Sequence, residues 1–207
     1  MLRKIFVLLL ITAIALLATL FRSADQATPI DLHLDTNNSQ LTLNIVAHKV
    51  AGEHRFVTRR DSEEIVRVIN TAQQIWSQAN ILFETVVIET KVSEQAIRAF
   101  TNGNFNAVLK EDFYQQGVIN IFFIDNLPAN GIAVYPSAVF VNDTTTVNDF
   151  RAAAHEIGHI LGLQHTKSSP SRLLFQGVNG TILTEEEIEL SRIGAKDFLT
   201  NFGEVTL

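Results

Sequence analysis

Apolar residues recur at two different spacings along this chain, one typical of strands and the other typical of helices. The strand-like runs are short, rich in Ile, Val and Phe, and lie at 41–50, 81–92 and 118–124. The last run, Val-Ile-Asn-Ile-Phe-Phe-Ile, is almost continuously apolar. A strand buried on both faces has this pattern, so 118–124 is expected at the centre of a sheet.

Helical spacing predicts the remaining elements. A capping-box pair, Asp61 and Glu64, opens a helix that reaches about residue 79, and a second pair, Thr184 and Glu187, opens a C-terminal helix that reaches about residue 199. Three further segments are expected to be helical: 93–100, 106–116 unless it is a loop, and 148–162.

The N-terminus has a pattern of its own. Arg3 and Lys4 precede an apolar run, residues 5–21, which together are typical of a secretory signal. As a helix this run would reach roughly 26 Å, slightly less than the ~30 Å hydrocarbon core of a membrane. Residues 1–24 are therefore expected to be a signal peptide or an uncleaved signal anchor. Both place the rest of the chain outside the cytoplasm, either secreted or anchored in a membrane through residues 5–21.

Composition narrows the class of protein. Polar residues 25–40 are expected to be a linker or short pro-segment, and 41–207 leaves enough chain for one domain with its own core. The chain has no cysteine, which excludes thiol catalysis, iron–sulfur clusters and disulfides. Its net charge is −6 and it has no basic stripe, so nucleic-acid binding is not expected.

The stretch His-Glu-Ile-Gly-His-Ile-Leu-Gly-Leu-Gln-His carries the candidate chemistry. His155 and His159 are four residues apart, so on a helix both face one ion. Gly162 permits a sharp turn, including one at positive φ, that brings His165 back as a third ligand. Three protein ligands with an open fourth position are typical of a catalytic zinc site, and Glu156 is free to act as general base on the water.

This spacing resembles the extended zinc-binding motif of the metzincin metallopeptidases. The resemblance implies an α+β fold: a mixed twisted sheet with a backing helix and an active-site helix, and a small C-terminal subdomain with one helix. It also implies one catalytic zinc ion, and peptide or protein substrates whose peptide bonds are hydrolysed with Glu156 as general base. On this reading residues 41–207 are the metallopeptidase catalytic domain.

Three positions define how the chain compares with that family. Leu174 stands where metzincins carry a methionine in the turn beneath the zinc, and it is an apolar residue of similar volume. Gln176 stands where some metzincins add a tyrosine ligand, so no tyrosine ligand is expected. Thr166 follows the third histidine and is closest to the serine of matrixins. Leu174 and Gly162 are therefore expected to support the site without binding the metal.

Other segments bear on substrates and ions. The segment that precedes the strand-like 138–141 looks like the edge strand above the cleft, where a substrate strand could pair with Gly131, Ile132, Ala133, Val134 and Tyr135. The oxygen-rich stretch 142–149 could hold calcium, but it lacks ligand spacing, so a polar turn with a helix cap is favoured. His33, His48 and His54 have no ligand-like spacing and are interpreted as surface or strand histidines.

Two other functions stay open at the level of sequence. The same fold could serve as a catalytically silent zinc-binding or adhesion module. The intact Glu156 argues against this module, because a structural zinc site needs no general base, and Leu174 is the one feature that favours it. A zinc hydrolase that acts on a non-protein amide is the third option.

Overall fold

A computed structural model describes residues 39–202, which lie within one compact unit, Thr36–Leu207. The expected signal, residues 1–24, lies outside the described residues, as does most of the expected linker or pro-segment, 25–40. Within the described part, none of the helices has both the length and the apolar character that crossing a membrane requires.

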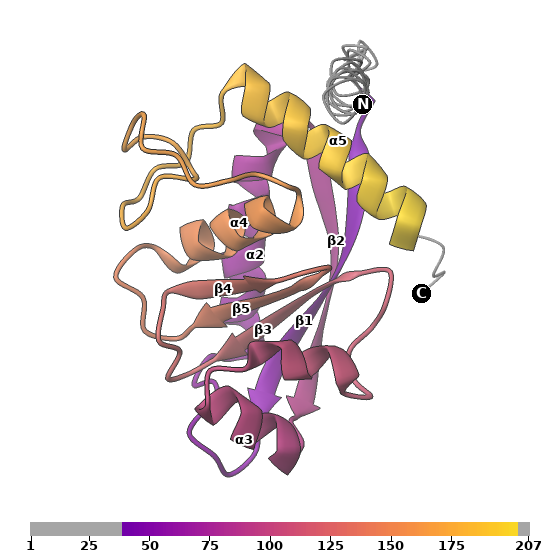
Figure 1. The fold of residues 1–207 in the computed structure, drawn as a ribbon, viewed down its shortest axis with the longest axis vertical. Coiled ribbons are helices and arrows are strands. Elements are labelled where there is room, and N and C mark those ends of the chain that lie inside the picture. The colour runs from indigo at the N-terminus through magenta and orange to yellow at the C-terminus, as the bar shows by residue number, and fades with distance from the viewer. Residues whose placement is uncertain (1–38, 203–207) are drawn as a thin grey trace, which may run out of the picture. The chain divides into compact units, whose positions relative to one another are not determined.

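One mixed sheet of five strands forms the centre of this unit, in the order β2-β1-β3-β5-β4 (Figure 1). The strands are β1 (Leu41–Ala51), β2 (Ile81–Lys91), β3 (Ile119–Ile124), β4 (Gly131–Val134) and β5 (Ala138–Asn142). All neighbours pair in parallel except β4, which pairs antiparallel with β5 and lies at the edge. Every residue of β3 is buried, so its predicted central place is confirmed.

The helices are α2 (Ser62–Trp76), α3 (Glu94–Thr101), α4 (Asp149–Ile160) and α5 (Glu185–Phe202), with two 3₁₀ helices, η1 (Ser77–Ala79) and η2 (Phe105–Lys110). Both predicted capping boxes are present: the Asp61 side chain accepts from Glu64 N at 2.8 Å, and Thr184 Oγ1 accepts from Glu187 N at 3.3 Å. The α+β fold expected from the motif is confirmed.

The segment 106–116 is not an α-helix. A 3₁₀ helix ends at Lys110, and the chain then continues as turns. The side chain of Asn120 on β3 accepts from Gln115 N at 3.0 Å and donates to Gln115 O at 2.7 Å. Because these bonds satisfy the backbone of Gln115, the second half of the segment is a loop held against the sheet.

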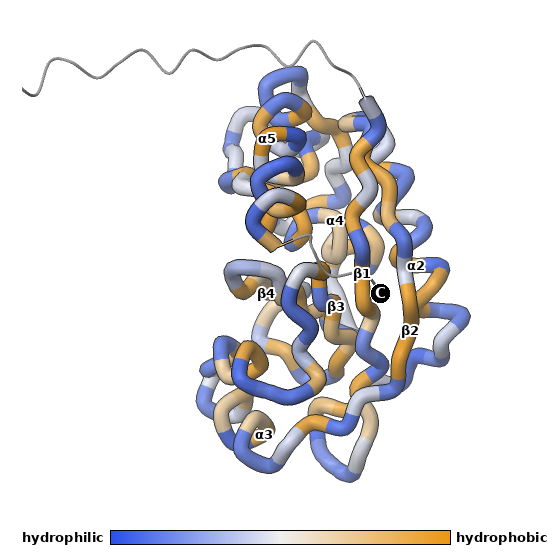
Figure 2. The backbone as a smooth tube through the Cα atoms, turned by 90° about the vertical axis from the view of Figure 1, so that its right-hand side faces the viewer, coloured by the Kyte–Doolittle hydropathy of each residue, from blue (hydrophilic) through white to orange (hydrophobic). Residues whose placement is uncertain are grey.

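Both faces of the sheet are covered. Alternate residues of β3 and β5 point to opposite sides, so Ile121 and Val139 pack toward α2, α4 and α5, while Phe122 and Phe140 pack toward α3 and η2. Figure 2 shows hydrophobic positions recurring along β1, β2 and α5 between hydrophilic ones. Trp76 at the end of α2 is fully buried, as expected of a core residue.

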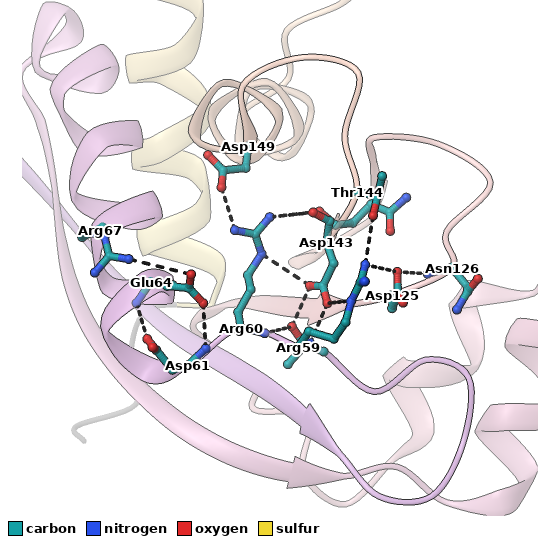
Figure 3. A network of polar contacts seen from close by, with 12 residues as sticks. Arg59, Arg60, Asp61, Glu64, Arg67, Asp125, Asn126, Asp143, Thr144 and Asp149 are labelled. Carbon is teal, nitrogen blue, oxygen red and sulfur yellow. Dashed lines mark hydrogen bonds and ion pairs between the residues drawn. The ribbon is translucent and has the colours of Figure 1, made fainter.

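A network of polar contacts ties the start of α4 to the connection between β1 and α2 (Figure 3). The Asp143 carboxylate accepts from Thr58 Oγ1 and from Arg59 N, both at 2.6 Å. Arg60 lies 3.4 Å from Asp143 Oδ1 through Nε, and its Nη1 donates to Asp149 Oδ2 at 2.6 Å. Since Asp149 is the first residue of α4, this network holds the beginning of that helix.

The same network accounts for the oxygen-rich stretch 142–149. Asp143 is engaged by protein donors, which agrees with a polar turn. The expected helix cap is wrong, because the side chain of Asn148 makes no capping hydrogen bond. The backbone N–H of Asn148 instead donates to Asn179 Oδ1 at 2.6 Å, so a distant loop binds this end of the helix.

His48 is a strand histidine, as predicted, but it is fully buried. Its Nε2 lies 3.1 Å from Asn120 Oδ1 and its Nδ1 lies 2.9 Å from Thr90 Oγ1. Burial lowers the pKa of the imidazole from 6.5 to about 4, and the hydrogen bond to Asn120 opposes part of that shift. His48 is therefore a neutral core residue that links three strands.

Candidate metal centre

Three histidines from the predicted motif meet at one point. His155 and His159 lie on α4, one turn apart, and the helix ends at Ile160. Gly162 then turns the chain at a φ of +87°, the left-handed conformation expected there. That turn places His165 Nε2 3.0 Å from His155 Nε2 and 3.1 Å from His159 Nε2. Within the part of the chain that the structure describes, this is the one cluster of three potential metal ligands.

The tautomers of the two helical histidines fit a metal ion. His155 Nδ1 lies 2.8 Å from Leu173 O, and His159 Nδ1 lies 2.9 Å from Leu163 O. A carbonyl only accepts hydrogen bonds, so each Nδ1 carries the proton and each Nε2 presents a lone pair to the centre. Nitrogens bound at 2.0–2.1 Å around a tetrahedral zinc ion are separated by about 3.3 Å, close to the spacing found here.

Protonation of His155 and of His165 is disfavoured, which also suits a metal. Burial, reinforced by nearby Arg151 and the other two histidines, lowers the pKa of His155 to about 4. The pKa of His165 is lowered by burial and by the charges of His159 and Arg151. Neutral imidazole is the form that binds a metal ion, so these ligands are ready at neutral pH.

The turn that contains Leu174 lies against α4 behind the triad. Leu174 is fully buried, and a Cβ built on Gly158, between the two helical histidines, would lie 3.3 Å from Leu174 Cδ2. Leu174 O accepts from Thr166 N at 3.0 Å, which joins this turn to the segment just after His165. Leu174 thus packs against the part of α4 that lies between His155 and His159.

Glu156 faces the same centre from α4 and is mostly buried. Burial raises the pKa of its carboxyl from 4.5 to about 7, and the charge of Arg151 and a hydrogen bond to the backbone of Ala133 oppose part of the shift. Strand β4 approaches the carboxylate closely: a Cβ built on Gly131 would lie only 2.6 Å from Glu156 Cγ.

A cavity of about 370 Å³ joins these groups. Its wall contains the three histidines and Glu156. It also contains residues that lie before and on β4 or follow Leu174 in the chain: Ala129, Asn130, Gly131, Ala133, Gln176 and Gly177. Of the five expected substrate-binding residues, Gly131 and Ala133 line it. Ile132 and Val134 pack instead on the opposite side of the sheet, since side chains alternate along a strand. Tyr135 is exposed and lines a separate pocket with the end of α4 and with α5.

Sequence reasoning missed Arg151, which also lines this cavity. Its side chain is only 3% exposed, and its Nη2 donates to Leu173 O at 2.7 Å and to Phe175 O. The available signal was a lone charge one helical turn before His155, in front of the run Ala152–Ala154. Gly158 was missed as well, although its contact with Leu174 leaves little room for a side chain.

This chain is similar to known proteins at the level of a family model, of two relatives and of a solved structure. A family model described as Matrixin matches residues 35–192. Two curated fungal proteins named extracellular metalloprotease, from Arthroderma benhamiae and Trichophyton verrucosum, are each 30% identical to this chain over 122 residues. The match covers 48% of this chain and 44% of each relative, so the chain spans less than half the length of these proteins.

Among solved structures, an archaemetzincin from Methanopyrus kandleri aligns with a TM-score of 0.53 and 15% identity. The alignment covers 79% of this chain and 99% of the archaemetzincin. At this identity the likeness concerns the fold, and it agrees with the mixed sheet and helices described above.

Proposed function

Because the chain belongs to the matrixin family, within the metzincin-like zinc proteases, we propose that it is a zinc-dependent endopeptidase that cleaves protein or peptide substrates outside the cytoplasm. One observation carries this proposal: the Nε2 atoms of three histidines converge in a cavity that also contains a buried carboxylate, Glu156. A site with three nitrogen ligands and an adjacent base suits hydrolysis better than structural metal binding.

His155, His159 and His165 would hold the zinc ion, and Glu156 would act as the general base. When bound, zinc lowers the pKa of water at the open position and polarises a carbonyl. Glu156 accepts the proton as the water attacks and passes it to the leaving nitrogen, which requires it to stay within reach of both. The carbonyls of Leu173 and Leu163 orient two of the imidazoles through their Nδ1 atoms.

Strand β4 would position the substrate. Among the described strands it pairs only with β5, and Gly131 and Ala133 on it line the cavity, so an extended peptide can add to the sheet at this edge. Gly131 and Ala133, which line the cavity, would contact the peptide directly. Ile132, Val134 and Tyr135 would contribute only through the shape and backbone of the strand.

We propose export for the whole chain. Support comes from the charged and apolar pattern of residues 1–24 and from the fungal relatives, whose names describe extracellular proteins. In this proposal 1–24 is a signal peptide or anchor, 25–40 is a linker or short pro-segment, and 41–207 is the catalytic domain. At the acidic turn, the Asp143 carboxylate is engaged by protein donors, so we propose no calcium ligand there.

Peptide cleavage tests the proposal. The chain from residue 25 onward, with and without Glu156→Ala, is incubated with a diverse peptide mixture, and products are identified by mass spectrometry. Zinc-dependent internal cuts by the native sequence, lost in the variant while zinc content stays the same, are expected. Zinc binding by both proteins without cleavage by either would favour the silent binding module, and cleavage confined to non-peptide amides would favour a different hydrolase.

A further inference from the structure

A buried cation without a carboxylate partner lies in the cavity beside the histidines. Arg151 is 3% exposed, and within the described residues no carboxylate lies at ion-pair distance from it. By contrast, the partly buried Arg172 pairs with Glu187 at 2.7 Å. A buried charge is costly unless it is paired and hydrogen-bonded, so the isolation of Arg151 needs an explanation.

The contacts of Arg151 occupy only one end of its guanidinium. Nη2 donates to Leu173 O and Phe175 O, on either side of Leu174, and so holds that turn against α4. Nε is buried and has no hydrogen-bond partner. Nη1 makes no hydrogen bond within the described residues and is not among the fully buried atoms, so it faces the cavity that Arg151 lines.

Glu156, the one acidic residue that lines the same cavity, is not an ion-pair partner of Arg151. Glu156 lowers the electrostatic cost of Arg151, but the two side chains form no ion pair. No other acidic residue lines the cavity. A guanidinium with one free donor edge in such a wall is well suited to bind a carboxylate from outside.

The position of Arg151 on α4 indicates which residue of a bound peptide would lie near its side chain. It lies one helical turn before His155, near the start of α4. The beginning of β4 lies at the same end, because Thr146 N, just before α4, donates to Asn130 Oδ1 at 2.7 Å, whereas Tyr135 after β4 lines a pocket with the end of α4. A peptide that pairs antiparallel with β4 has its C-terminal side toward Gly131 and Asn130, the beginning of that strand. The residue just after the scissile bond therefore enters the part of the cavity that contains Arg151.

We infer that Arg151 selects substrates with a carboxylate on the residue that follows the scissile bond. This inference rests on the proposed peptidase function and names its substrate class. The carboxylate has two sources, the side chain of Asp or Glu and the free C-terminus of a peptide cleaved at its last bond. In both, Nη1 donates to the carboxylate while Nη2 keeps its bonds to the turn.

Matched peptides test the inference without changing the protein. One pair differs only by Glu or Gln after the scissile bond, and a second pair differs only by a C-terminal acid or amide one residue beyond it. The native protein is expected to cleave the Glu peptide, the C-terminal acid or both with at least about tenfold higher kcat/KM than the neutral partner, since a charge-assisted hydrogen bond is lost in that partner. The pair that shows the preference identifies the source. Equal cleavage within both pairs would overturn the inference.

Variants of Arg151 separate recognition from support of the turn. Arg151→Met should abolish the preference for the acidic peptide, and Arg151→Lys should retain part of it. If Arg151 only supports the turn, Arg151→Lys lowers cleavage of both peptides equally and there is no preference to lose. A preference that persists in a folded, zinc-loaded Arg151→Met protein would assign the carboxylate to the metal and overturn the inference.

A binding measurement keeps this test independent of catalysis. Fluorescence anisotropy with labelled peptides and the zinc-loaded Glu156→Ala variant should give at least about tenfold tighter binding of the acidic peptide. If the native protein cleaves neither peptide but the acidic one binds more tightly, the peptidase proposal is overturned and Arg151 remains a carboxylate-binding site. Unselective binding together with cleavage would leave the peptidase and overturn the role of Arg151.

Discussion

Substitution of Gly131 by alanine should impair catalysis by displacing the base. A Cβ at this position would lie 2.6 Å from Glu156 Cγ and 3.0 Å from Phe140 O. Ordinary contact begins at 3.4 Å, so Glu156 must retreat by about 0.8 Å if β4 stays in place. Strand β4 has little freedom to move away, because it is paired with β5 along its length. A misplacement of about 1 Å can cost about 10²-fold in rate, so Gly131→Ala should lower kcat/KM by about that factor.

The assay compares kcat and KM of the native protein and Gly131→Ala on one cleaved peptide, together with zinc content and urea unfolding. Overpacking should lower the unfolding free energy by about 1–3 kcal/mol, while zinc content stays unchanged because no histidine is touched. Gly158→Ala is the matched control on the same helix as Glu156, since its Cβ would lie 3.3 Å from Leu174 Cδ2 and 3.6 Å from Trp76 Cζ2, a milder crowding in which Glu156 is not among the nearest contacts. If Gly131→Ala kept kcat/KM within about twofold of the native value while Gly158→Ala did the same, the contact would not position the base.

Three further predictions concern stability, and each is measured by denaturant or thermal unfolding. The pKa of His48 is about 4 in the folded protein and near 6.5 when unfolded, so the unfolded chain binds the extra proton between these values. Stability should therefore fall by about 3 kcal/mol as pH drops from 6.5 to 4, and His48→Gln should flatten this part of the profile; equal slopes would refute the assignment. Gly194→Ala would place a Cβ against the backbone oxygen of Leu161, where α5 meets the end of α4, and should cost about 1–3 kcal/mol; an unchanged Tm would contradict this packing. Thr184→Ala removes the capping bond to Glu187 N and should cost about 1 kcal/mol, whereas no loss would show that this cap does not stabilise α5.

The features predicted from sequence depend on residues that are close along the chain. The capping pairs at Asp61 and Thr184, the strands and the motif from His155 to His165 all arise from local spacing. Gly162 is the clearest case, because its positive φ follows from the need to return His165 to the helix that carries the other ligands. Such features can be predicted from the sequence because a single turn or a single strand is enough to form them.

The features that were missed depend on contacts between distant segments. Arg151 is held by carbonyls more than twenty residues away. The sequence left 106–116 open between helix and loop, and its second half is a loop in which Asn120 on β3 binds the backbone of Gln115. Asn148 makes no side-chain cap, and the contacts at this end of α4 come instead from two distant residues, Asn179 and Arg60. No periodicity along the chain reports these pairings, so only the fold reveals them.

Zinc titration tests the central claim most directly. The metal-free protein is titrated with zinc while bound metal and peptide cleavage are measured in the same samples, beside His165→Ala. Cleavage should rise in proportion to bound zinc and saturate at one ion per chain, and the variant should bind zinc more weakly and cleave little. Cleavage by the metal-free protein, or full activity of His165→Ala at saturating zinc, would contradict a catalytic centre built from the three histidines.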